Sequence, residues 1–147
     1  MSVAARLLAL AHLGIAAIWL GSMTYSLMVV QPRVGRFFTD ETRREEFLVL
    51  LANGNRRPVV ALVSVLVVTA GGLAVLTSPA YAVVLALYLA AAAVFWHVSW
   101  RHWPARVFAR PAELAGFRRQ LRTEAWTMLV LVGTAYAVAL IVTLWRV

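Results

Sequence analysis

Long uncharged stretches dominate the chain and alternate with two segments rich in charge. The stretches cover about residues 7–30, 58–77, 80–100 and 125–145. The middle two are separated only by the turn formers Thr77, Ser78 and Pro79. Crossing the hydrocarbon core of a bilayer takes about 20 mostly apolar residues, so the pattern predicts four membrane spans.

Helices are the expected form of these spans, because lipid cannot satisfy free backbone N–H and C=O groups. The predicted fold class is an all-α integral membrane protein, with four transmembrane helices in an antiparallel bundle that forms one domain over residues 1–147. The first apolar run is too long for the 7 to 15 apolar residues typical of a signal peptide, so we interpret residues 7–30 as a span.

Each of the two charged connections carries a shorter helical pattern. Thr42 and Glu45 have the spacing of a capping box, and Asn53 with Gly54 provides a stop signal. Pro111 suits the start of a second short helix. We therefore expect two amphipathic helices that lie at the level of the lipid headgroups.

Composition agrees with a membrane protein, since 63% of residues are hydrophobic and only 14% are charged. The chain contains no cysteine, which excludes disulfides and thiolate chemistry. It contains no lysine either, so Schiff-base and lysine-base chemistry are excluded. No nucleophile with an adjacent base and no phosphate-binding glycine loop is evident, so enzymatic function is uncertain and not favoured.

All 14 basic residues are arginine, and 12 of them lie in the two charged connections. The positive-inside rule therefore predicts that both connections are cytoplasmic and that both termini lie outside, in a multi-pass protein of the cytoplasmic (plasma) membrane. Anionic headgroups on the cytoplasmic side explain the net charge of +8 without a nucleic-acid partner.

A histidine stands inside the first span, where His12, Trp19 and Met23 share one helical face. Gly14 and Gly21 lie on the opposite face, where small residues let another helix approach. An ionisable residue within a membrane is a candidate for function. His12 is therefore either a ligand or relay, or a neutral side chain that bonds a hydroxyl or carbonyl across the bundle.

A second histidine, His97, comes late in the third span and belongs to the other leaflet, at about the depth of Met23. His12 and His97 are separated by about 15 Å along the membrane normal, too far to hold one metal ion. The helix face before His97 carries small alanines that either pack closely or admit a flat cofactor. His102 falls beyond the span, and we expect it to be solvated.

Three segments, "HLGIAAIWLG", "QPRVGRFF" and "FRRQLRTEAW", resemble the four-helix membrane families around the copper-resistance D (CopD-type) domain, over nearly the whole chain. The family pattern of His, six residues, Trp, one residue, Gly is matched by His12, Trp19 and Gly21. A basic stretch that ends in an acidic residue at the last helix is matched by Arg118, Arg119, Arg122 and Glu124. The resemblance implies copper handling.

Pro32, Arg33 and His97 are similar to a related family, the HemJ-type membrane protoporphyrinogen oxidases, which bind haem b. That family carries a lysine tied to activity in its third helix. The present chain has no lysine, so the resemblance does not imply the oxidase reaction.

Three functional hypotheses follow. The first is copper handling, with His12, Met23 and His97 as ligands along a path through the bundle, since imidazole and thioether suit copper. The second is a haem b protein with His12 or His97 as axial ligand, Trp19 beside the cofactor, and Arg33, Arg118 or Arg122 paired with propionates. The third is an accessory subunit of a larger membrane complex, or a homo-oligomer, in which the histidines are structural.

Overall fold

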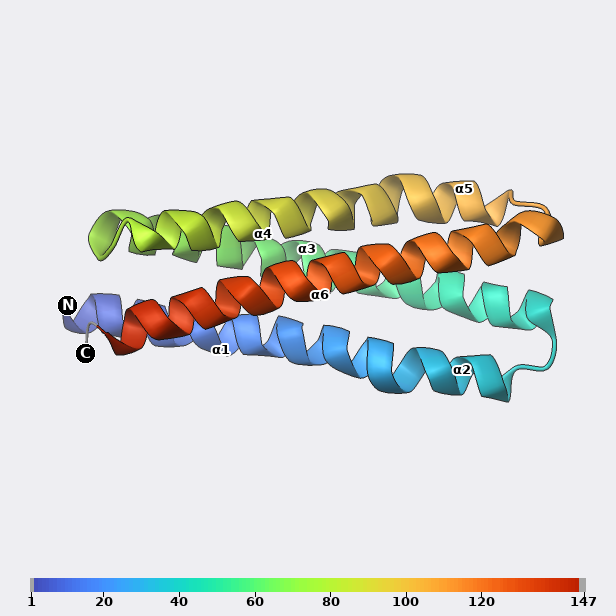
Figure 1. Cartoon of the computed structure of the whole chain (residues 1–147), viewed down its shortest axis with the longest axis horizontal. Coiled ribbons are helices and arrows are strands. Elements are labelled where there is room, and N and C mark those ends of the chain that lie inside the picture. Colours follow the sequence, from blue (N-terminus) through green and yellow to red (C-terminus); the bar gives the residue numbers. More distant parts are fainter. Residues whose placement is uncertain (1, 146–147) are drawn as a thin grey trace.

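A computed structural model describes residues 2–145 and confirms an all-α protein built from four long helical rods packed as a bundle (Figure 1). Consecutive rods run in opposite directions, so both termini and the turn between α3 and α4 lie at one end (Figure 1). The elements in chain order are α1 (Val3–Tyr25), η1 (Ser26–Val30), α2 (Gln31–Phe37), α3 (Glu41–Leu76), α4 (Ala80–His97), η2 (Val98–His102), α5 (Trp103–Val107), η3 (Pro111–Glu113) and α6 (Leu114–Leu144).

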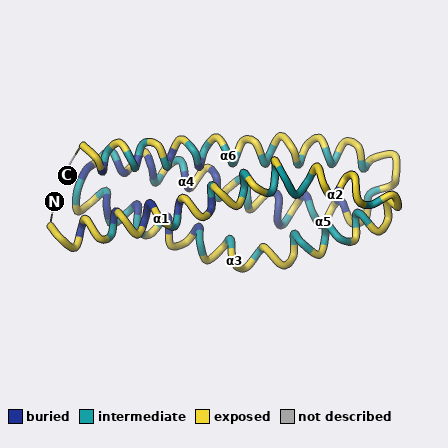
Figure 2. Tube along the Cα trace, turned by 90° about the horizontal axis from the view of Figure 1, so that it is seen from below, coloured by how far each residue is buried: buried dark blue, intermediate teal, exposed yellow. Residues whose placement is uncertain are grey.

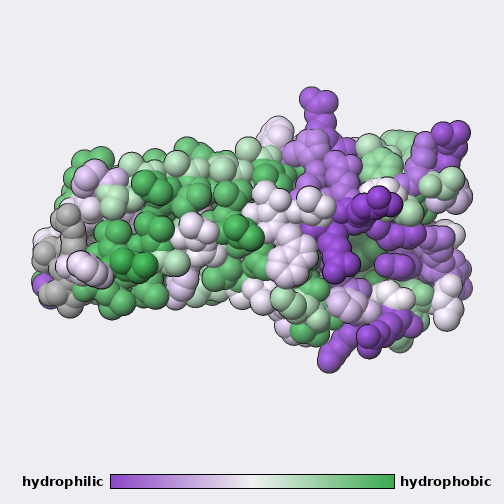
Figure 3. Space-filling model, viewed as in Figure 1, coloured by the Kyte–Doolittle hydropathy of each residue, from purple (hydrophilic) through white to green (hydrophobic). Residues whose placement is uncertain are grey.

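Each rod is long and apolar enough to cross a membrane, as in a multi-pass membrane protein. The rods contain 28 to 36 residues, which corresponds to about 42 to 54 Å. The hydrocarbon core is only about 30 Å thick, so one end of the bundle must project beyond it. Figure 3 shows a hydrophobic surface over most of the length and a hydrophilic surface at the end that carries both long connections. We call this the polar end.

The expected short helices in the connections are not separate elements, which corrects the prediction from sequence. α3 runs without a break from Glu41 through Gly54 and Pro58 to Leu76. The stop expected at Asn53 and Gly54 does not occur, since one glycine in a helix costs only about 1 kcal/mol. The second connection begins its helical turn at Pro111 as expected, but α6 then continues into the span.

A π-helical turn joins α1 to α2 in the first rod, and another joins α4 to α5 in the third rod, so that both rods continue into the polar end. In η1 the Gln31 N–H donates to Ser26 O, and in η2 the Trp103 N–H donates to Val98 O. Each turn ends two residues before a proline, Pro32 or Pro104. Proline has no N–H to donate and its ring crowds the preceding turn, and a π turn is one way to absorb such a defect without ending the helix.

The bundle core lies mostly in the half that holds the termini, where small and aromatic residues meet (Figure 2). His12 and Trp19 are buried there, on the interior face expected from their spacing. Gly14 and Gly21 face outward, and apart from their chain neighbours and own helix backbone no atom of the described residues lies within 4 Å of where their Cβ atoms would be. The close helix approach expected at these glycines is therefore not made within the bundle.

An ion-pair network ties the rods together at the polar end. Arg106 of α5 donates from Nε and Nη2 to both carboxylate oxygens of Glu45 in α3, at 2.8 and 2.9 Å. The Arg106 side chain is 1% exposed and that of Glu45 is 15% exposed. Arg118 of α6 donates to Glu41 at 2.6 Å and lies 3.5 Å from Glu45. Three rods therefore meet at one carboxylate.

We expect Glu45→Ala to lower the free energy of unfolding by about 3 kcal/mol, because it leaves the Arg106 charge buried without its partner. Thermal or denaturant unfolding of the detergent-solubilised protein measures the change. Arg43→Ala is the control, because it removes the exposed pair with Asp40, and such a pair contributes little. Equal losses from the two substitutions would contradict a dominant role for Glu45.

Candidate functional site

His12 of α1 is held across the bundle by Thr69 of α3, with 2.7 Å between Nδ1 and Oγ1. The Thr69 hydroxyl has a single hydrogen, and it donates to the carbonyl oxygen of Val65 at 2.7 Å. In this arrangement Thr69 accepts from His12, and the imidazole proton is assigned to Nδ1. The opposite nitrogen, Nε2, is left with a free lone pair.

The surroundings of this nitrogen are aromatic. Tyr81 and Tyr88 of α4 both present T-shaped contacts to the His12 ring, with centroids 6.0 and 5.5 Å away. Trp19 stacks on Tyr88 with centroids 6.3 Å apart. His12 Nε2 and the Tyr88 hydroxyl have no hydrogen-bond partner within residues 2–145, whereas the Tyr81 hydroxyl bonds Thr143 at 2.7 Å.

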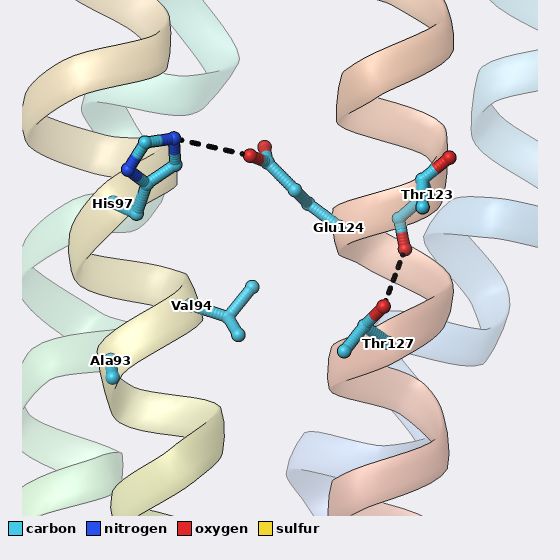
Figure 4. Close-up of a pocket in the computed structure, with 6 residues that line it drawn as sticks. All are labelled: Ala93, Val94, His97, Thr123, Glu124 and Thr127. Carbon is cyan, nitrogen blue, oxygen red and sulfur yellow. Dashed lines mark hydrogen bonds and ion pairs between the residues drawn. The ribbon is translucent and has the colours of Figure 1, made fainter.

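A second polar cluster lies nearer the polar end, between α4, η2 and α6. His97 Nε2 lies 3.3 Å from one oxygen of Glu124, and His102 Nδ1 lies 3.6 Å from the other oxygen. Figure 4 shows His97 and Glu124 pointing toward each other from neighbouring helices. The His97 side chain is 51% exposed, while that of Glu124 is 16% exposed. The carboxylate is therefore flanked by two imidazoles, and its Oε1 also accepts from Gln120 Nε2 at 3.0 Å.

His102 is buried, at 2% exposure, which corrects the expectation that it is solvated. The helix does not end near Trp100, so Val98, Ser99, His102 and Arg106 fall on one buried stripe. The His102 ring meets Phe117 edge-on at 5.4 Å between centroids. Neither of its nitrogens has a hydrogen-bond partner in the described part of the chain.

A groove of about 360 Å³ adjoins this cluster, and Figure 4 shows its lining. Its lining residues are Ala93, Val94, His97, Thr123, Glu124 and Thr127. The Thr127 hydroxyl donates to the Thr123 carbonyl at 2.9 Å. Ala93, Thr123 and Thr127 are exposed, so the groove opens on the flank of the bundle. Of the small alanine face expected before His97, Ala93 lines this groove.

The structure does not bring together the ligands predicted from sequence. Met23 is 11 positions from His12 on the same rod, about 16 Å along the axis, so the two cannot share an ion. Arg118 is engaged by Glu41 and Glu45, and Arg33 and Arg122 are exposed. Among residues 2–145, no group of three or more His, Cys, Asp or Glu side chains is arranged to hold a metal ion.

Sequence reasoning missed the partners of His97. A depth count could have found Glu124, because it lies about 30 Å from Leu144 while His97 lies about 26 Å from Ala80. Both distances run from the same end of the bundle, so the two side chains reach a similar level. His102 could not be found this way without knowledge of the π turn.

The comparisons with known proteins returned no match: no protein-family model, no curated protein and no solved structure is similar to this chain. The resemblance to CopD-type and HemJ-type families therefore rests on the short motifs alone.

The two core tyrosines give a matched pair of substitutions. We expect Tyr81→Phe to lower the free energy of unfolding by about 1 kcal/mol, because it removes the hydrogen bond with Thr143. Tyr88→Phe removes a buried hydroxyl that has no partner, so the same unfolding measurement should show no loss or a gain. A larger loss for Tyr88→Phe would mean that its hydroxyl is satisfied in the folded protein.

Proposed function

We propose that this multi-pass membrane protein handles copper and binds Cu²⁺ between His97 and Glu124. The observation that carries the proposal is the 3.3 Å separation of His97 Nε2 and Glu124 Oε1. Nitrogen and oxygen ligands lie about 2.0 to 2.1 Å from a first-row ion, and the right angles of tetragonal Cu²⁺ then separate neighbouring ligands by about 2.8 to 3.0 Å. The pair lies within about 0.5 Å of that spacing, so a small side-chain shift lets both atoms bind one ion.

The position of His102 also supports a copper site at Glu124. His102 is buried, neither of its nitrogens has a hydrogen-bond partner among the described residues, and it lies beside the second oxygen of Glu124. Such a group either orients the carboxylate or joins the ion after a side-chain rotation. Imidazole and carboxylate accept several divalent ions, and Cu²⁺ binds most tightly among first-row metals. The adjoining groove leaves room for water or an incoming ligand at the remaining positions.

The orientation of the bundle is part of this proposal. Twelve of the 14 arginines lie in the two connections that form the polar end. The positive-inside rule then makes the polar end cytoplasmic and both termini external. His97 lies about 26 Å from Ala80 along its rod, so the copper site sits at the inner boundary of the hydrocarbon core, within reach of the cytoplasm.

Haem b binding is a second candidate, and His12 is the observation that favours it. Its Nδ1 contacts the Thr69 hydroxyl at 2.7 Å, and its Nε2 is buried without a partner among residues 2–145. This is the orientation that an axial histidine takes when a second residue fixes its tautomer. The two candidates therefore depend on different histidines, and substitution can separate them.

We expect metal-free protein in detergent to bind one equivalent of Cu²⁺, with nitrogen coordination visible by electron paramagnetic resonance. His97→Ala and Glu124→Gln should each weaken binding by roughly 10- to 100-fold, the range seen when a ligand or its support is lost. His12→Ala is the matched control and should bind copper as the wild type does. Absence of copper binding in the wild type, or its loss in His12→Ala alone, would refute the proposal.

The haem candidate makes the opposite prediction. Protein purified with haem present should show a Soret band that His12→Ala abolishes and His97→Ala leaves in place. A preparation that never binds porphyrin would rule out haem b.

A further inference from the structure

The arginines of the polar end fall into two groups that differ in their partners. Four of them pair with carboxylates: Arg43, Arg106, Arg110 and Arg118. The others have no carboxylate partner within residues 2–145: Arg33, Arg36, Arg44, Arg56, Arg57, Arg101, Arg119 and Arg122. The second group includes every arginine of the polar end that lies next to an apolar span.

The depth of these unpaired arginines matches the boundary of a bilayer. Arg57 lies about 29 Å from Leu76 along α3, at 1.5 Å per residue. Arg101 lies about 32 Å from Ala80, and Arg122 lies about 33 Å from Leu144. Three different rods therefore present a cation about one hydrocarbon thickness, roughly 30 Å, from the same end of the bundle. That is the level of the lipid phosphates.

At this depth, Arg56 of α3 contacts residues of η2. Its Nη2 donates to the carbonyl oxygen of Ser99 at 2.6 Å, and its guanidinium carbon lies 5.0 Å from the centre of the Trp100 ring. Its Nε is buried and has no partner among the described residues. Arg57 and Arg101, the next residues along the two segments, are exposed. We call Arg56, Arg57 and Arg101, together with Trp100, the arginine site.

We propose that the arginine site binds the phosphate of an anionic phospholipid from the leaflet at the polar end. A guanidinium matches the geometry of a phosphate and donates two parallel hydrogen bonds to it. Trp100 stacks on Trp96 with centroids 4.2 Å apart, and tryptophan is typical of the headgroup level.

A lipid fits better than a free anion because an apolar surface adjoins the arginines. Val60 and Trp96 are exposed on the rods that supply the site, at 41% and 59%. Acyl chains can cover these side chains, whereas a free anion leaves them bare. Glu124, the carboxylate nearest this depth, lies between His97 and His102 and so does not neutralise the arginines. The excess positive charge favours an anionic lipid over a zwitterionic one.

Detergent-purified protein, delipidated and mixed with phosphatidylglycerol or with phosphatidylcholine, tests the proposal. Native mass spectrometry counts bound lipids, and a thermal melt reports the stabilisation that binding produces. We expect phosphatidylglycerol to bind more tightly and to raise the Tm. The double variant Arg57→Gln/Arg101→Gln should weaken that binding roughly 30-fold, since each arginine near an anionic surface contributes about fivefold. It leaves the contact of Arg56 with Ser99 intact.

The matched control is Arg36→Gln/Arg119→Gln, which removes two unpaired arginines farther from the spans and should change lipid affinity less than about threefold. If both double variants weaken phosphatidylglycerol binding equally, the affinity depends on overall charge, and the proposed binding site is wrong. Equal binding of the two lipids would overturn it as well. Inorganic phosphate should leave the Tm unchanged, and a shift as large as that from phosphatidylglycerol would identify a free anion in place of the lipid. Copper binding is not part of these readouts, so the two proposals fail separately.

Discussion

The pairing of Arg106 with Glu45 is the interaction on which the polar end depends. The rods are longer than the hydrocarbon core, so their last turns receive no support from lipid. Isolated helix ends of this length would fray in water. A buried bidentate ion pair, extended by Arg118 to Glu41, joins three rods there and lets them continue as one bundle. The same ion pairs join the rod that carries His97 and His102 and the rod that carries Glu124 to α3.

The π turns link backbone chemistry to the polar cluster. Pro104 interrupts the hydrogen bonding of its rod, and η2 absorbs the interruption. The same turn carries Ser99, Trp100 and His102, which serve Arg56 and Glu124. Had the helix ended at Trp100, His102 would lie in water and Glu124 would have one imidazole beside it instead of two. Pro104 thus shapes both the cluster around Glu124 and the arginine site.

Sequence alone predicted the four spans because length and the absence of charge are sufficient to define a membrane helix. It failed in the connections, where Asn53 with Gly54 was a plausible stop but packing between rods outweighed local propensity. The interior position of His12 and Trp19 followed from helical periodicity. The partners Thr69, Glu124 and His102 did not, because contacts between rods depend on relative rotation and depth, which a single pattern does not encode.

The groove beside His97 opens on the flank of the bundle and not along its axis. At that depth the surrounding medium is the margin of the lipid layer. Any molecule that reaches the groove by this route diffuses in two dimensions, and its relevant concentration is a number per area of membrane. Amphiphilic carriers would then deliver cargo far more readily than freely dissolved species, and the composition of the leaflet would govern how fast the groove is visited.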